Sequence, residues 1–265
     1  MPELEYTERY RITLHRPGFG GVFAGWMTTR DGRLCMTTAS SLWPQRGEHP
    51  ALNRPGLVRT TAIGSAAFEC DSASVFERVF ADDVAVCVWN RPQDEILCDY
   101  LKRTVRSGTW QRTTRVDPIE PEFDEVLYDF ADGLGKIRLV TELSGLVDLF
   151  ATLADAQMVG VRMTATMQRE CPRFHVDRVG LQLLCTWVGE GTEWLAHEDV
   201  IRERLGHQLG GRGEVKKPRA KVHRMQPFAV GALKGEAWPG NVGRGAVHRS
   251  PAPASCRVFV SLDAL

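Results

Sequence analysis

Between about residues 90 and 156, hydrophobic residues recur every three to four positions, as in α-helices. An apolar run over Val84–Trp89 predicts a buried strand. The sequence Asn90-Arg91-Pro92 then opens a predicted helix, because proline is favoured in the first turn. Its apolar face consists of Ile96, Leu97, Tyr100, Leu101 and Val105. The same spacing predicts a second helix between Glu142 and Ala156, and an acidic, proline-containing loop over 116–125 separates the two.

After Gly160 the period of the apolar residues changes to two. Apolar and polar residues alternate over 161–168, as on a half-buried strand. Further strands are predicted at Leu181–Val188, Phe228–Leu233, Gly245–His248 and Arg257–Leu262. Helices followed by strands, without regular alternation, predict an α+β fold with an antiparallel barrel or jelly roll in the C-terminal half.

The first part of the chain has no clear period. Gly, Pro, Arg, Thr and Ser interrupt every apolar run up to about residue 67. We therefore predict a poorly defined N-terminal extension over residues 1–67. Residues 68–265 are predicted to form the jelly-roll domain, which begins with the helices.

Composition limits the class of protein. With 43% hydrophobic and 25% charged residues, the 265-residue chain is typical of folded globular proteins. Its 33 basic and 33 acidic residues cancel, so we expect no nucleic-acid or membrane partner. Seven cysteines without a CxxC pair, and an N-terminus without an apolar signal segment, favour the cytoplasm. Composition leaves the oligomeric state open.

The segment CPRFHVD, residues 171–177, carries the most informative chemistry. On an extended strand, residues two apart project to the same face, so His175 and Asp177 can offer an imidazole and a carboxylate to one metal ion. A polar pair at a strand edge is the alternative. His197 and Asp199 form a second His-x-Asp pair, but they lie at the start of a predicted short helix, where residues two apart do not face each other.

A third ligand and a cation follow near the C-terminus. His248 comes after a glycine-rich approach and completes the two-His, one-carboxylate set of a non-haem Fe(II) oxygenase. Arg257 opens the next strand and can grip the far carboxylate of 2-oxoglutarate through two hydrogen bonds. An antiparallel return from His248 would bring it beside the ligand strand. Arg249, which should face away from the iron, and Thr186 are the other candidates for cosubstrate binding.

Several other residues have two interpretations. The candidates for substrate contact are Arg173, Trp194 and Trp238, although buried tryptophans are usually core or rim residues. Lys234, Glu236 and Asn241 can bind an anion, but Pro239-Gly240-Asn241 also predicts a turn. A zinc–thiolate site is conceivable for Cys171, Cys185 and Cys256, although their spacing matches no standard zinc motif.

Two long blocks resemble a known family. The strings CPRFHVDRVGLQLLCTWVGEGTEWL and LKGEAWPGNVGRGAVHRSP are similar to the signature blocks of a bacterial family catalogued as domain of unknown function 1826, over about Phe76–Asp263. The order of elements also resembles the prolyl-hydroxylase-like 2-oxoglutarate oxygenases. This resemblance implies a double-stranded β-helix (jelly roll, cupin-like) core with helices packed on it. One departure is Phe259, which stands where those oxygenases have a small polar residue.

Two functions are compatible with these residues. The first is a mononuclear Fe(II)- and 2-oxoglutarate-dependent oxygenase that uses O2 to oxidise, and most simply hydroxylate, a small molecule or an amino-acid side chain. Its metal ligands and catalytic residues would be His175, Asp177 and His248. The second is a non-catalytic zinc protein of metal homeostasis with the same ligands, since imidazole suits both metals. A degenerate barrel that serves as an interaction module is a third possibility.

Overall fold

The chain divides into two compact units, Met1–Leu57 and Val58–Leu265. A computed structural model describes residues 24–28, 34–38, 60–64, 66–104, 108–205, 214–252 and 256–265. In the first unit, β1 (Ala24–Thr28) and β2 (Leu34–Thr38) pair as an antiparallel hairpin. The extension predicted over residues 1–67 falls largely outside the described residues, and its boundary stays a prediction.

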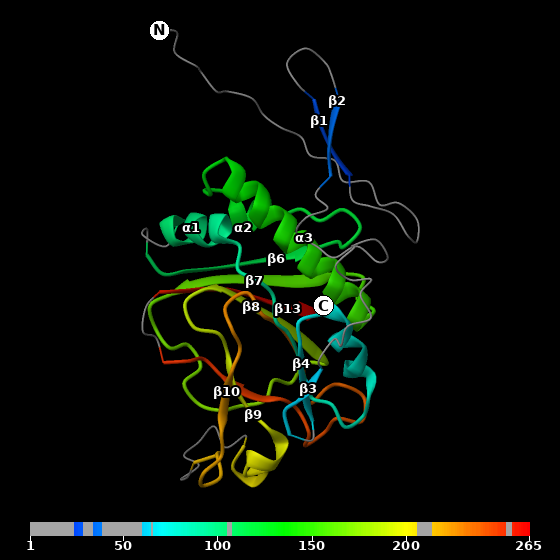
Figure 1. Cartoon of the computed structure of the whole chain (residues 1–265), viewed down its shortest axis with the longest axis vertical. Helices are drawn as coiled ribbons and strands as arrows, with labels where there is room; N and C mark the ends of the chain where they lie inside the picture. The colour runs from blue at the N-terminus through cyan, green and yellow to red at the C-terminus, as the bar shows by residue number, and fades with distance from the viewer. Residues whose placement is uncertain are drawn as a thin grey trace. The chain divides into compact units, whose positions relative to one another are not determined.

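A large sheet forms the centre of the second unit (Figure 1). Its eight strands lie in the order β3-β4-β5-β11-β8-β13-β7-β6, and every pair is antiparallel except β4 with β5. The strands are β3 (Thr61–Ala62), β4 (Ala67–Cys70), β5 (Val86–Trp89), β6 (Trp110–Val116), β7 (Val159–Thr166), β8 (Leu181–Val188), β11 (Val230–Lys234) and β13 (Arg257–Ala264).

A second, smaller sheet lies in the order β10-β9-β12. It consists of β9 (Glu193–Leu195), β10 (Val222–Arg224) and β12 (Val247–Arg249), and a bridge between His175 and His248 extends it by one segment. From β7 onward the chain alternates between the two sheets. Strands β7, β8, β11 and β13 belong to the large sheet, and the segments between them, His175, β9 with β10, and β12, belong to the small sheet. This is the topology of a jelly roll. The predicted α+β fold with a double-stranded β-helix core is confirmed.

The longer helices lie before the jelly roll in the chain. They are the 3-10 helix η1 (Ala73–Phe80) and the α-helices α1 (Glu95–Thr104), α2 (Asp124–Leu127) and α3 (Leu134–Ala154), and two short 3-10 helices, η3 (His197–Asp199) and η4 (Arg202–Arg204), follow β9. Helix α1 begins later than Asn90 because Asp94 Oδ1 accepts the Leu97 amide, 3.1 Å away, and so caps the first turn. Helix α3 begins eight residues before the predicted Glu142, directly after Gly133.

Helix α3 covers the outer face of the large sheet, where it contacts β7 and β13. Its inward residues have no exposed surface; they are Leu139, Leu143, Leu146, Val147 and Phe150. Strand β8 is buried on both faces, which explains its nearly continuous apolar sequence. Alternate residues of β8 and β13 therefore point either to the helices, α1 beside β8 and α3 beside β13, or to the space between the two sheets.

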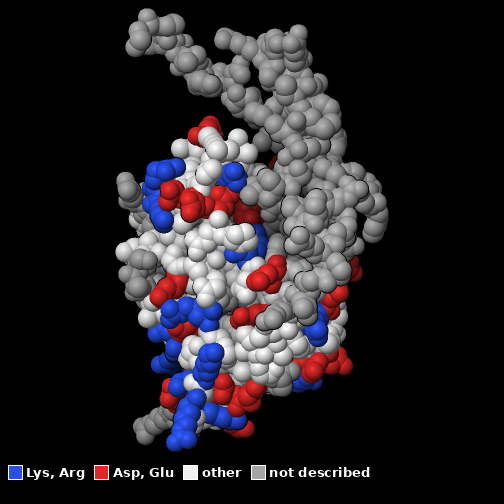
Figure 2. Space-filling view, viewed as in Figure 1, with Lys and Arg blue, Asp and Glu red and all other residues white. Residues whose placement is uncertain are grey.

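Charges of both signs are interspersed over the second unit. Figure 2 shows acidic and basic residues side by side on the face in view, which agrees with a formal net charge of zero. Among the described helices, none has both the length and the hydropathy that a bilayer crossing requires.

Candidate metal centre

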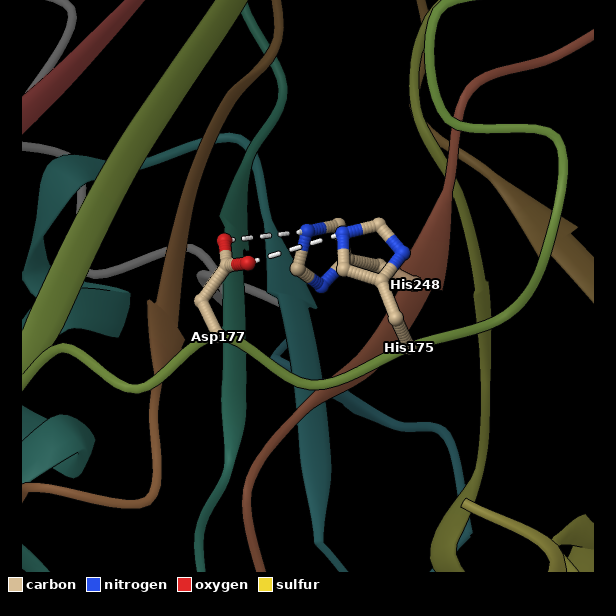
Figure 3. Close-up of side chains that lie close together, drawn as sticks. All are labelled: His175, Asp177 and His248. Atoms are coloured by element: carbon tan, nitrogen blue, oxygen red, sulfur yellow. Dashed lines mark ion pairs between the residues drawn. The ribbon is translucent and has the colours of Figure 1, made fainter. Parts of the chain in front are cut away.

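The structure brings His175, Asp177 and His248 together on the inner side of the small sheet (Figure 3). The backbones of His175 and His248 exchange two N–H···O hydrogen bonds of 3.0 Å, so the two rings lie side by side with centroids 4.5 Å apart. Asp177 follows two residues after His175 and turns its carboxylate toward both rings. One ligand atom from each residue lies within 4.8 Å of the others. A single ion can therefore contact all three.

Hydrogen bonds fix which nitrogen of each ring faces the carboxylate. His175 Nδ1 lies 3.0 Å from the Arg173 carbonyl, and His248 Nδ1 lies 3.2 Å from the Ala246 carbonyl. A carbonyl oxygen only accepts, so each Nδ1 must carry the proton. Each Nε2 then presents a lone pair, 3.5 Å from one oxygen of Asp177. Metal-bound histidines normally have this second hydrogen bond.

The charge states also suit a metal ligand set. Burial, followed by the neighbouring His248, lowers the pKa of His175 below its ordinary value. Burial alone would raise the pKa of Asp177, but the interactions of its carboxylate with His248, His175 and Arg162 outweigh burial, and the net shift of the pKa is downward. At neutral pH His175 is therefore neutral and the carboxylate is ionised, as metal binding requires. Two imidazoles and one carboxylate fit non-haem Fe(II), and they also bind Zn(II).

Arg257 is a buried cation on the inner face of the large sheet. Its Nη2 donates to Thr186 Oγ1 at 3.1 Å and to Thr192 Oγ1 at 3.0 Å. The guanidinium lies over the ring of Phe259, 4.0 Å from the centroid. Its Nε has no hydrogen-bond partner, and it forms no ion pair within the described part of the chain. Burial lowers the pKa of Arg257 to about 10, and Glu170 opposes this only in part.

The strand that carries Arg257 pairs with other strands than the sequence predicted. The predicted antiparallel pairing of its strand with the His248 strand is wrong: β12 pairs with β9 in the small sheet, whereas β13 pairs with β7 and β8 in the large sheet. The chain thus changes from the small sheet to the large sheet between β12 and β13. Arg257 therefore lies in the wall opposite the sheet that carries His248.

Arg249 lies on the other face of β12 from His248. Its Nε donates to Glu193 Oε2 at 2.7 Å, and its guanidinium lies 4.1 Å from the ring centroid of Phe174. Glu193 also accepts from Arg224 at 2.6 Å. This carboxylate already neutralises Arg249, so the structure gives no support to a cosubstrate role for that residue, which stays a prediction.

The residues predicted to contact substrate are dispersed. Trp194 is fully buried, stacks on His223 with centroids 4.5 Å apart, and has an indole N–H that finds no partner among the residues the structure describes. Trp238 lies beside Phe80 and below Lys234 Nζ, and Arg173 is exposed. The substrate roles of the two tryptophans and of Arg173 stay predictions.

Other sequence candidates do not gather into a metal site. Within the described residues, only the triad forms a group of three potential ligands, so the three cysteines considered for zinc are not brought together. His197 and Asp199 lie in a 3-10 helix, as the sequence indicated, and His197 Nε2 lies 2.7 Å from the Arg244 carbonyl. Thr192, which contacts Arg257, was missed, because no spacing signal connects two residues 65 positions apart.

Several solved structures are distantly similar to this chain. The fold is similar to a prolyl-4-hydroxylase from Pseudomonas putida (8% identity, covering 72% of this chain and 97% of that one, TM-score 0.39). It is also similar to the dioxygenase for auxin oxidation from rice (12%, 72% and 77%, TM-score 0.42) and to Neurospora crassa T7H in complex with alpha-KG (10%, 78% and 88%, TM-score 0.43). These likenesses are too low to indicate function, and the fold assignment rests on the strand topology.

The search of curated proteins found no match. A family model described as a protein of unknown function, DUF1826, matches residues 70–263, close to the predicted Phe76–Asp263. The chain therefore belongs to the DUF1826 family.

Proposed function

We propose that this protein is a mononuclear non-haem Fe(II)- and 2-oxoglutarate-dependent oxygenase that oxidises a small molecule or an amino-acid side chain. The observation that carries the proposal is that the triad and Arg257 lie on opposite walls of the barrel. Two imidazoles and an ionised carboxylate converge on one point of the small sheet, and a buried guanidinium that has no carboxylate partner among the described residues lies in the opposite wall. A metal ion would bind the three ligand atoms of the triad, and the carboxylate of a cosubstrate would neutralise the guanidinium of Arg257.

His175, Asp177 and His248 hold the iron in this proposal. Their backbone and Nδ1 hydrogen bonds fix the rings before the metal arrives, so little reorganisation is needed on binding. The bound iron, with O2 and 2-oxoglutarate, supplies the oxidising chemistry. The protein contributes the geometry and leaves the remaining coordination positions to ligands from outside the chain.

Arg257 holds the distal carboxylate of 2-oxoglutarate. Thr186 and Thr192 each accept a hydrogen bond from its Nη2, so each hydroxyl proton is free to donate to an oxygen of the same carboxylate. Phe259 lacks the small polar group that prolyl-hydroxylase-like oxygenases usually have at this position, and its ring instead packs against one side of the guanidinium. The threonines provide the hydroxyls in its place.

Metal analysis followed by an anaerobic titration tests the proposal. Protein purified without added metal is titrated with Fe(II) and then with 2-oxoglutarate, and the absorption spectrum is recorded. We expect a charge-transfer band that requires both additions. Tight zinc with no such band would favour the zinc-binding alternative, and a protein that binds neither metal would contradict the site altogether.

His248→Ala gives the sharpest variant for that titration. Removal of one of three ligands should weaken Fe(II) binding by more than about 100-fold and abolish the band. His197→Ala is the matched control, because His197 belongs to the other His-x-Asp pair and contacts only a backbone carbonyl through its ring. If His248→Ala retained full iron stoichiometry, the ligand assignment would be wrong.

A further inference from the structure

The loop between β11 and β12 is bound to the turn that follows Asp177. Three consecutive amides of this loop donate to carbonyls of that turn: Gly235 to Gly180 at 2.9 Å, Glu236 to Asp177 at 3.0 Å, and Ala237 to Val179 at 3.1 Å. The backbone of the only acidic residue in the triad is therefore positioned by a segment that lies almost 60 residues later in the sequence.

The side chain of Asn241 fixes one of these three amides. Asn241 is 3% exposed, and its Nδ2 donates to the Gly235 carbonyl at 2.8 Å. The carbonyl of Gly235 and the N–H of Glu236 belong to one planar peptide group and point in opposite directions. When Asn241 holds the carbonyl on one side, the N–H on the other side is aimed at Asp177.

The packing at this point leaves little freedom. A Cβ on Gly235 would lie 2.1 Å from the Val179 oxygen and 2.7 Å from the Asp177 oxygen, so only glycine permits so close an approach. At the far end of the loop, the Ala246 amide donates to the Lys234 carbonyl at 2.8 Å, two residues before His248. One loop thus adjoins two of the three residues of the triad.

We propose that Asn241 is a positioning residue for the metal centre, which acts through the Gly235–Glu236 peptide to hold Asp177 in place for the ion. The inference rests on the proposed function, because it assumes that the triad binds metal. The sequence predicted a turn at Pro239-Gly240-Asn241, and the backbone does turn there, with the Asn241 amide donating to the Trp238 carbonyl at 2.9 Å. That turn needs only the backbone of Asn241, so the buried side chain has a separate task.

Cobalt binding tests this role without any turnover. Co(II) alone is titrated into the wild-type protein and into Asn241→Ala and Asn241→Asp, and both the affinity and the visible absorption spectrum are measured. Asn241→Asp keeps the size of the side chain but lacks the N–H donor. We expect both variants to bind Co(II) about 10- to 100-fold more weakly, with an altered spectrum, because loss of an outer partner commonly has an effect of this size.

Leu139→Ala is the control for simple loss of stability. Leu139 is fully buried in α3, on the outer side of the large sheet, so the variant should unfold at a lower temperature but bind Co(II) like the wild type. If both Asn241 variants bound Co(II) with wild-type affinity and spectrum, Asn241 would have no positioning role and the metal site would stand. If the wild type bound no Co(II), the metal site itself would be wrong.

Discussion

Two buried arginines on opposite faces of the large sheet differ in their partners: one is paired with a carboxylate, and the other is bound only by hydroxyl groups. Arg91 lies on the outer side, where its two terminal nitrogens bind the two carboxylate oxygens of Glu142 from α3 and its Nε donates to the Phe228 carbonyl at 3.0 Å. Arg257 lies on the inner side and has two threonine hydroxyls but no carboxylate in the described residues.

The pKa values of the two groups move in opposite directions. Burial alone would lower the pKa of Arg91, but the charge and hydrogen bonds of Glu142, with a smaller effect of Cys185, raise it above its ordinary value. The pKa of Arg257 falls to about 10, chiefly because of burial. A buried charge without a partner destabilises a folded protein, so its presence points to a ligand that completes it. Arg91 has its partner within the fold, and the proposed function gives Arg257 its partner in the cosubstrate.

The largest effect should come from breaking the outer pair. Glu142→Gln leaves the Arg91 charge buried without a counter-ion, at a site where the two side chains are only 8% and 12% exposed. We expect a loss of about 3–5 kcal/mol in the free energy of unfolding, measured with urea. Replacing both partners by methionine should recover most of that loss, and a cost below about 1 kcal/mol for Glu142→Gln alone would remove the contrast between the two arginines.

A smaller effect should follow from removing one hydroxyl beside the inner arginine. Thr192→Val deletes a hydrogen bond to a charged group, worth about 1.5–3 kcal/mol, and should weaken 2-oxoglutarate binding by about tenfold or more. Thr166→Val is the matched control, because Thr166 is equally buried but its hydroxyl bonds only to the backbone of Gln168. Equal losses of cosubstrate affinity in the two variants would remove Thr192 from the site.

The smallest effect on stability should come from Arg257 itself. A cation whose pKa is depressed on folding destabilises the protein at neutral pH, and this cost is relieved only as the pH rises through about 10. Arg257→Met should therefore keep the free energy of unfolding at pH 7 within about 1 kcal/mol of the wild type, or raise it. A loss as large as that of Glu142→Gln would show that Arg257 is a structural residue as well.

The sequence predicted those parts of the fold that have a clear hydrophobic period. Strands β7, β8 and β13 follow the predicted ranges closely, because one or both of their faces are buried. Strand β6 was not predicted, because its sequence WQRTTRV has polar residues on both faces. Its side chains alternate between half-buried and exposed, and only Val116 at its end is buried. Two of the triad residues were recognised by their i, i+2 spacing, and His248 by its place after the glycine-rich segment.

What the sequence could not predict depends on contacts between distant segments. Arg91 and Glu142 are 51 residues apart, and Arg257 and Thr192 are 65 apart, so no local spacing identifies either pair. The sheet that carries Arg257 was also assigned wrongly, since adjacent strands in a chain usually pair and here the chain crosses between sheets. Such crossings define a jelly roll but leave no periodic signal of their own.

The affinity for 2-oxoglutarate in Arg257→Met tests the central claim most directly. Binding is measured by calorimetry on the Mn(II)-loaded protein without O2, with Arg249→Ala as the control, because Glu193 already neutralises that arginine. Loss of one partner of a buried charge pair costs about 2–5 kcal/mol, so we expect one 2-oxoglutarate per wild-type chain and at least about 30-fold weaker binding in Arg257→Met, with metal affinity unchanged. Equal binding by Arg257→Met and the wild type, or a larger loss in Arg249→Ala, would contradict the account.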